Sequence, residues 1–364
     1  MPPLNVSSCP PPRLHREPSR LALSTSANPK LQESWARKVS ANCAKALKEN
    51  ETLYSLCTRT FRAFQNVGIS VVPNHFYWPI PDLSDIERRQ WTIYPPPPGC
   101  DLRLDYQSAF VHDVVARYIP EFSFRDKPGE NGDYHFNNGF FETVDAEVTY
   151  SMLRHFRHSR IIEIGSGYST RVIAAALKAN EEREGISGGE LVTIDPNPER
   201  LPKDGLGDSV TVVPRRVQDV DLDFFSSLGE GDVLFIDSSH VASVGSDVVR
   251  EYLEVIPRLN PGVIVHVHDI FLPSDYPRRA VLQNLWFWSE QYLLQAFLSF
   301  NTKFEVLWTS SAMQFFRPRI LETYFPRWKH SYRKMPRAVR RFVPSADNER
   351  VWPSSFWMRR VQTV

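Results

Sequence analysis

Two groups of residues in this 364-residue chain have types and a spacing suited to chemistry. The first is the segment Glu163-Ile-Gly-Ser-Gly-Tyr-Ser-Thr170, which follows a short apolar run and opens a helical pattern. Close glycines let a ligand approach the backbone, and the free N–H groups at the start of a helix attract polar ligand groups. We therefore expect a nucleotide-type cofactor to bind at Gly165, Ser166, Gly167 and Tyr168.

Two residues of this turn distinguish it from a dinucleotide-binding fingerprint. That fingerprint has a third glycine, but Thr170 occupies its position here. Glu163 stands two positions before the first glycine, and its carboxylate suits a cationic ligand better than a pyrophosphate. A nicotinamide-dependent oxidoreductase is thus an alternative that both residues disfavour.

Two further acids follow the next apolar runs. Asp195 ends the second run, where a carboxylate can accept both hydroxyls of a ribose; its alternative role is a turn residue before Pro196. Asp219 follows the third run, where it can face the edge of an adenine or be an ordinary solvated loop acid. Both are predicted cofactor-binding residues.

The second group of residues follows the fourth and fifth apolar runs. Asp237-Ser-Ser-His240 comes after the fourth run, and His266, His268 and Asp269 lie on or after the fifth. Adjacent parallel strands deliver their C-terminal ends to the same crevice, so these side chains are expected to converge. His266 is the weakest candidate, because it shares the strand face of His268 without ending the strand.

These residues require a sheet to position them. Five nearly continuous aliphatic runs predict buried parallel strands, and helical patterns alternate with them over Thr170–Ala179, Gly245–Leu259 and Leu282–Phe300. The fold class is therefore α/β, a Rossmann-like doubly wound sheet. Two more strands, Phe304–Trp308 and Phe356–Val361, are predicted as an antiparallel edge around a basic insertion at about 316–354. The five predicted parallel strands are Arg160–Ile164, Leu191–Ile194, Val210–Val213, Val233–Ile236 and Val263–Val267.

Together these motifs resemble the class I S-adenosylmethionine-dependent methyltransferases, and more closely a subgroup related to macrocin, caffeoyl-CoA and catechol-type O-methyltransferases. The resemblance covers about 160–310 and the last predicted strand. It implies a seven-stranded sheet of order 3-2-1-4-5-7-6 with an antiparallel last strand. It also implies that Glu163, Gly165 and Gly167 cradle the methionine part of the cofactor, that Asp195 holds the ribose, and that Asp237 abuts the sulfonium.

Two mechanisms of methyl transfer fit the second group. In one, His240 or His268 is a general base that Asp237 or Asp269 orients. In the other, Asp237 and Asp269 hold a divalent cation such as Mg²⁺, which helps the acceptor oxygen to ionise. Catechol-type relatives carry an Asp-Asn or Asp-Asp pair at the end of the fifth strand, whereas this chain has Asp269-Ile270. That departure weakens the metal alternative.

The rest of the chain is predicted to be accessory. Residues 1–30 form a Pro- and Ser-rich disordered tail, and residues 31–134 form a helical, loop-rich segment before a methyltransferase domain at 135–364. The accessory segment is predicted to contain helices over Leu31–Asn50, Leu53–Phe64 and Ala109–Ile119, and a strand over Gly68–Val72. The helix Leu282–Phe300 carries the aromatic residues Trp286, Trp288 and Tyr292, which are predicted to pack in the core and the lid and not to form a substrate-binding box.

Composition limits the partners. The chain has 43 Lys and Arg against 42 Asp and Glu, so no net field attracts nucleic acid or a membrane surface, and no apolar run is long enough to span a bilayer. The four cysteines, Cys9, Cys43, Cys57 and Cys100, show neither disulfide nor zinc spacing. The cytoplasm is the default location, organellar targeting by the tail stays open, and so does a homo-oligomer.

The leading hypothesis is O-methylation of a small or medium hydroxylated acceptor such as a sugar. A non-catalytic module that binds the cofactor is the main alternative outside enzymes.

Overall fold

The computed structural model describes residues 60–72, 76–88, 95–129, 132–186, 189–201, 206, 209–329 and 353–362. The chain divides into two compact units, Met1–Asp82 and Leu83–Val364. In the first unit residues 60–65 are helical, whereas the strand predicted over Gly68–Val72 is wrong. Gly68 has φ +79° and closes a turn after the helix, and no described strand pairs with the residues that follow. The helix predicted over Leu31–Asn50 and residues 53–59 of the next one lie outside the described residues.

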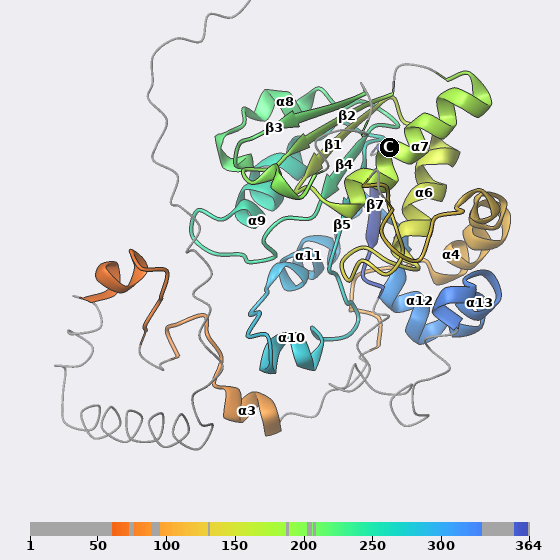
Figure 1. The fold of residues 1–364 in the computed structure, drawn as a ribbon. Helices are drawn as coiled ribbons and strands as arrows, with labels where there is room; N and C mark the ends of the chain where they lie inside the picture. The colour runs from red at the N-terminus through yellow and green to blue at the C-terminus, as the bar shows by residue number, and fades with distance from the viewer. Residues whose placement is uncertain are drawn as a thin grey trace, which may run out of the picture. The chain divides into compact units, whose positions relative to one another are not determined.

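The second unit contains the predicted sheet. Its seven strands run in the order β3-β2-β1-β4-β5-β7-β6, which confirms the α/β Rossmann-like fold class (Figure 1). The first five strands are parallel, and β7 pairs antiparallel with both β5 and β6. The strands are β1 Arg160–Ile164, β2 Glu190–Ile194, β3 Val210–Val213, β4 Val233–Ile236, β5 Ile264–Val267, β6 Phe304–Thr309 and β7 Phe356–Arg360.

Alternating side chains of the central strands pack into two separate cores. Ile161, Val233 and Phe235 belong to a core on one face of the sheet, while Ile162 and Leu234 belong to a core on the other face. Both faces are therefore dry, which explains why the sequence shows continuous aliphatic runs instead of a polar alternation. β3 forms an edge, and its central residues are exposed.

Helices cover each face of the sheet. On one face lie α4 Leu104–Phe110, α6 Asp145–Phe156, α7 Tyr168–Glu184, α12 Ser310–Phe316 and α13 Pro318–Tyr324 (Figure 1). On the other lie α8 Leu222–Ser226, α9 Asp247–Arg250 and α11 Glu290–Leu298. The shorter helical pieces are α3 Leu83–Arg88, α5 Ala116–Tyr118, α10 Arg278–Leu282, the π-helical turns η1 Val111–Val115 and η5 Glu251–Val255, and the 3₁₀ turns η2 Ile119–Glu121, η3 Pro198–Arg200, η4 Val217–Asp219 and η6 Ile256–Arg258.

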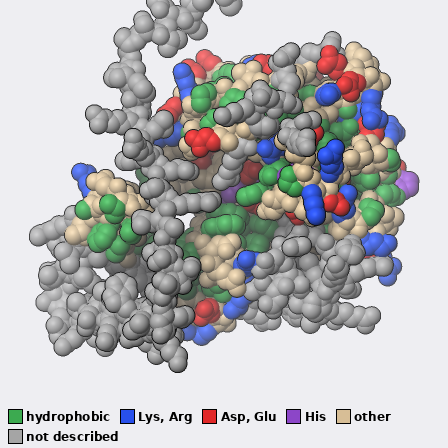
Figure 2. Space-filling view, in the orientation of Figure 1, with side chains coloured by type: hydrophobic (Ala, Val, Ile, Leu, Met, Phe, Trp, Pro, Cys, Tyr) green, Lys and Arg blue, Asp and Glu red, His purple; other side chains and the backbone are tan. Residues whose placement is uncertain are grey.

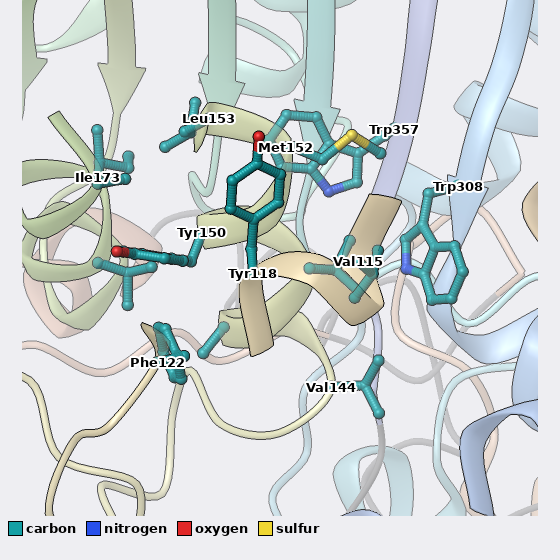
Figure 3. Close-up of a cluster of buried hydrophobic side chains, with 14 of the residues drawn as sticks. Val115, Tyr118, Phe122, Val144, Tyr150, Met152, Leu153, Ile173, Trp308 and Trp357 are labelled. Carbon is teal, nitrogen blue, oxygen red and sulfur yellow. The ribbon is translucent and has the colours of Figure 1, made fainter. Parts of the chain in front are cut away.

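The helix that begins at Leu104 belongs to the same core as the sheet. Figure 3 shows Val115 and Tyr118 beside Trp308 and Trp357 of the last two strands, and all four side chains are buried. The predicted helix Ala109–Ile119 is thus present, within a longer helical stretch from Leu104 to Glu121. The sequence-based boundary at residue 135 differs from the structural one, because residues 83–134 lie in the same compact unit as the sheet.

Two other differences concern helices. The predicted helix Leu282–Phe300 is wrong over 283–289, because α10 ends at Leu282, α11 begins at Glu290 and the residues between them are not helical. The sequence reading also omitted α6, which lies directly before β1 and buries ten of its twelve residues. Of the basic insertion, the structure describes residues to 329 and from 353 onward; α13 lies within it, and α12 ends at Phe316 where the insertion begins. Within the described residues, no helix has the length and apolar character needed to cross a membrane.

Candidate functional site

The glycine turn joins β1 to α7 at the C-terminal edge of the sheet. Gly165 has φ +86°, and a Cβ added there would lie 1.9 Å from the carbonyl oxygen of Asp237. Only glycine fits this close approach of two strand ends. Gly167 differs, because its backbone is extended and a Cβ there would meet no atom within 4 Å. The turn is therefore tight at its first glycine and open at its second.

Glu163 braces this turn from within. Its side chain is fully buried, and its two carboxylate oxygens accept hydrogen bonds from the hydroxyls of Ser169 and Thr170, both at 2.7 Å. Thr170 in turn accepts a hydrogen bond from the Gly167 N–H at 2.9 Å. Burial raises the pKa of Glu163 to about 7, although these hydroxyls oppose the rise. The threonine in place of a third glycine is thus part of a carboxylate-centred cap on α7.

Asp195 ends β2 and faces the same turn. Its Oδ2 accepts hydrogen bonds from the Ser166 N–H at 3.0 Å and from the Ser166 hydroxyl at 2.6 Å, while its Oδ1 accepts from the Asn197 N–H at 2.7 Å. The carboxylate is partly exposed, and Oδ1, which accepts a single hydrogen bond, has one further lone pair for a ligand hydroxyl. The predicted cofactor-binding residues Ser166 and Asp195 are therefore in direct contact.

Asp219 occupies a different environment. It ends η4, is half exposed, and forms a two-point contact with Arg216 at 2.8 and 2.9 Å. The hydrogen bond from Arg216 lowers the pKa of Asp219, so the carboxylate is ionised and paired. Among the described residues its hydrogen-bond and ion-pair partner is Arg216 and not the glycine turn, and its cofactor-binding role stays a prediction.

The turn and the second group of residues meet at the end of β4. The Asp237 N–H donates to the Ile164 carbonyl at 2.9 Å, and the Asp237 carbonyl is the atom that Gly165 approaches. Asp237 thus lies between the predicted cofactor turn and His240. In Figure 2 a histidine surface and an acidic surface are visible near the centre of one face, in a hollow bordered by hydrophobic side chains.

His240 lies at the centre of three carboxylates. Its Nδ1 is 2.8 Å from Oε2 of Glu290, and its Nε2 is 3.4 Å from both Oδ1 of Asp237 and Oδ2 of Asp269. The imidazole is buried and lies against the Trp288 ring, with ring centroids 4.9 Å apart. Burial alone would lower the pKa of His240, but Asp237, Glu290 and Asp269 outweigh it and hold the pKa well above its ordinary value.

The two histidines of β5 differ from each other. His268 is buried and its Nε2 is 3.9 Å from Oδ1 of Asp269; burial lowers its pKa, but the charges of Asp237, Asp269 and Asp145 produce a net rise. His266 is fully buried between Phe235, at a centroid distance of 3.7 Å, and Trp357, and burial holds its pKa well below the ordinary value. His266 therefore has a packing role.

The donor set does not fit the predicted metal site. Among the described residues no group of three or more His, Cys, Asp or Glu side chains is arranged to hold a metal ion. The position between Asp237 and Asp269, where such an ion would lie, is taken by Nε2 of His240. An imidazolium here would direct its Nε2 proton toward these two carboxylates, and both the histidine mechanism and the metal mechanism stay predictions.

A family model described as a methyltransferase domain matches residues 162–270. The matched segment runs from β1 to the residue after Asp269, so it contains the glycine turn and the His240 cluster. This chain carries a class I S-adenosylmethionine-dependent methyltransferase domain. The methyltransferase domain is thus confirmed, while the closer likeness to the macrocin, caffeoyl-CoA and catechol-type subgroup stays a hypothesis.

Three proteins show similarity to this chain in sequence or in structure. A protein of Archaeoglobus fulgidus described as uncharacterized is 32% identical over 175 residues, which are 46% of this chain and 77% of that protein. A methyltransferase of Podospora anserina bound to SAH is 15% identical, with 81% of this chain and 100% of that chain covered and a TM-score of 0.37. An O-methyltransferase from Bacillus cereus in complex with SAH is 14% identical, with 70% and 91% covered and a TM-score of 0.30. These TM-scores carry no argument about the acceptor of the methyltransferase domain.

Sequence reasoning missed three residues of the methyltransferase domain that contact the cluster. Glu290 contacts His240 from the start of α11, and Trp288 packs against the same ring. Asp145, at the start of α6, accepts hydrogen bonds from the backbone N–H groups of Ser354 and Ser355 and lies close enough to His268 to raise its pKa. The sequence offered little signal for them, because α6 was not predicted and Glu290 and Trp288 lay inside the predicted helix Leu282–Phe300.

Proposed function

We propose that the protein methylates a hydroxyl oxygen of a small or medium-sized acceptor, with His240 as the general base. The observation that supports this most strongly is the imidazole of His240 enclosed by Asp237, Asp269 and Glu290 beside the glycine turn. A hydroxyl must lose its proton to a base as the new bond forms, whereas a neutral amine attacks without that help. A buried, carboxylate-flanked imidazole is therefore best explained by an oxygen acceptor.

The donor side of the proposal rests on the first group of residues. Ser166, Gly167, Tyr168 and Asp195 would hold S-adenosylmethionine, with Asp219 at the adenine end and Asp237 beside the sulfonium. When bound, S-adenosylmethionine supplies an electrophilic methyl group on a sulfonium. The open space at Gly167 and the remaining lone pair on Oδ1 of Asp195 fit such a ligand. Glu163 and Gly165 would shape the turn, since one is fully buried and the other is packed against the Asp237 carbonyl.

The raised pKa of His240 has a mechanistic consequence. Because the surrounding carboxylates raise the pKa of His240, they favour the protonated imidazole in the isolated protein, and the ring must release that proton before it can act as a base. A cation bound beside Asp237 shares that carboxylate with His240 and lowers the pKa of the imidazole by charge repulsion. We therefore expect binding of the cationic donor to free Nε2, after which Asp237 and Asp269 stabilise the imidazolium that forms when the acceptor loses its proton.

The first test of the proposal is methyl transfer from S-adenosylmethionine to a panel of phenols, sugars and amines. We expect His240→Asn to lower kcat on hydroxyl acceptors by on the order of 10²- to 10⁴-fold while donor affinity changes little. His112→Asn is the matched control, because His112 is exposed, its Nδ1 pairs with the neighbouring Asp113, and its ring contacts Tyr324. Wild-type rates in His240→Asn would contradict the proposal, and transfer to amines alone would exclude the oxygen acceptor.

A calorimetric test addresses the proton. Titration in buffers of different ionisation enthalpy should show proton release when S-adenosylmethionine binds and none when its uncharged demethylated product binds. The release should disappear in His240→Asn.

Activity should be the same with EDTA and with added Mg²⁺, and a strict requirement for Mg²⁺ would favour the alternative in which Asp237 and Asp269 hold a metal ion.

A further inference from the structure

We propose that Glu290 is the positioning residue of the general base, because it holds the proton on Nδ1 of His240 and so leaves Nε2 as the nitrogen that faces the acceptor. This inference rests on the proposed role of His240. It assigns a function to Glu290, which lies fifty residues after His240 in the sequence. A neutral imidazole carries its proton on one nitrogen only, and the hydrogen bond at that nitrogen decides which one it is.

The two sides of the His240 ring differ in distance and exposure. The contact between Nδ1 and Glu290 is 2.8 Å, whereas both contacts of Nε2 are 3.4 Å. The Glu290 side chain is fully buried, but those of Asp237 and Asp269 are 30% and 24% exposed. Nδ1 therefore makes the strong contact on the closed side of the site, and Nε2 points to the side that a substrate can reach.

The start of α11 also fixes the backbone of His240. The N–H groups of Ser289 and Glu290 both donate to the His240 carbonyl, at 2.9 and 3.2 Å, and the Ser289 hydroxyl accepts from the Ala242 N–H at 2.9 Å. His240 has φ +63°, a left-handed conformation that costs a non-glycine residue energy and that these bonds sustain. One helix end thus determines both the backbone and the ring orientation of the base.

Packing alone does not account for a carboxylate at this position. A fully buried carboxyl group is costly unless a partner compensates it, and a leucine or methionine would fill the same space at no such cost. Burial raises the pKa of Glu290, and the hydrogen bond with His240 is the leading opposing effect. The compensating partner of Glu290 is therefore the base itself, as in other sites where a carboxylate orients an imidazole.

The variant that tests the inference is Glu290→Gln, with Glu251→Gln as the matched control. The glutamine keeps the size of the side chain, but its amide can donate to Nδ1 and so favours the opposite tautomer. Glu251 is buried to the same degree, but its Oε2 accepts from Ser238, not from His240. We expect Glu290→Gln to lower kcat by about 10²-fold or more with donor affinity unchanged, and Glu251→Gln to keep kcat within about threefold. A kcat of Glu290→Gln equal to that of Glu251→Gln would overturn the inference.

A spectroscopic readout makes the test independent of variant folding. Nitrogen NMR of ¹⁵N-histidine-labelled wild-type protein bound to S-adenosylmethionine, with the His240 signals assigned by His240→Asn, should show the proton on Nδ1. A proton on Nε2 would overturn the inference even if Glu290→Gln did not fold. If His240→Asn itself retains wild-type activity, the proposed function fails; if His240→Asn is inactive and Glu290→Gln behaves like wild type, only the positioning role fails.

Discussion

The donor side and the acceptor side of this site are built in different ways. The donor side consists of the turn after β1 and the end of β2, and its contacts join residues that the sequence already groups, such as Ser166 and Asp195. The acceptor side collects His240, Asp269 and Glu290 from the ends of β4 and β5 and the start of α11, and the imidazole at its centre is buried. The comparison teaches that a binding turn is encoded by local backbone requirements, whereas a buried catalytic group depends on packing between distant elements.

The largest effect is expected at the point where the two sides touch. Gly165→Ala would place a methyl group 1.9 Å from the Asp237 carbonyl and would strain a backbone at φ +86°, so we expect a loss of about 4 kcal/mol of stability or more. Thermal unfolding would measure it. Gly167→Ala is the control: its methyl group enters open space, so the melting temperature should hold while donor affinity falls. Equal melting temperatures for the two variants would mean that the sides are not in tight contact.

The second largest effect concerns Glu163, whose buried carboxyl group supports the donor turn through hydrogen bonds. The pKa of Glu163 is about 7 against an ordinary 4.5, so the folded state holds a proton that the unfolded state loses between these values. Stability should therefore fall as pH rises through this window, and Glu163→Gln should gain on wild type by on the order of 2–3 kcal/mol between pH 4.5 and pH 8.

Chemical denaturation at several pH values would check this prediction. Glu147→Gln is the control, because burial also raises the pKa of Glu147 to about 7, but the residue lies on α6 and contacts Thr143. Both variants should show the same trend of stability with pH, and only Glu163→Gln should change donor affinity. An unchanged affinity would separate Glu163 from the donor side.

The smallest effects compare the contributions of two donor-side residues, Asp195 and Asp219, to donor affinity. Asp195→Ala removes a carboxylate that contacts the turn, and we expect donor affinity to fall by about 10- to 100-fold. Asp219→Ala removes a half-exposed carboxylate paired with Arg216, so the loss should stay below about threefold. Calorimetric titration of the donor into both variants measures the difference, and the reverse order would show that Asp219 is the stronger ligand-binding residue.

Most of the sheet could be predicted from the sequence, because strands buried on both faces have continuous aliphatic runs that few other elements have. All seven strands predicted for the sheet are present, within a residue or two at their ends, and only the separate strand predicted over Gly68–Val72 is wrong. The helices were harder. α6 shows no clean polar face, because it is buried on nearly all sides. The segment 283–289, which contains three aromatic residues, resembles a helix in composition although it forms an irregular connection.

The residues of the proposed donor side could be nominated from the sequence, whereas those of the proposed acceptor side could be nominated only in part. Gly165 and Asp237 were identified because a strand end followed by a glycine or an acid is a local pattern. Glu290 was not identified, because a single acid at the start of a helix is common. Its partner His240 lies in the loop after β4, fifty residues earlier in the sequence. The burial of His240 among carboxylates, which decides its pKa, depends on side-chain packing that spacing along the chain does not encode.

The position of β7 has a consequence for protein synthesis. β7 is the last strand, yet it inserts between β5 and β6, and Ser354 just before it contacts Asp145 and Asp269. During translation the strands β1 to β4 and the donor turn are synthesised more than a hundred residues before β7, because β4 ends at Ile236 and β7 begins at Phe356. A nascent chain can therefore form the proposed donor-binding surface well before it contains the segment that contacts Asp145 and Asp269.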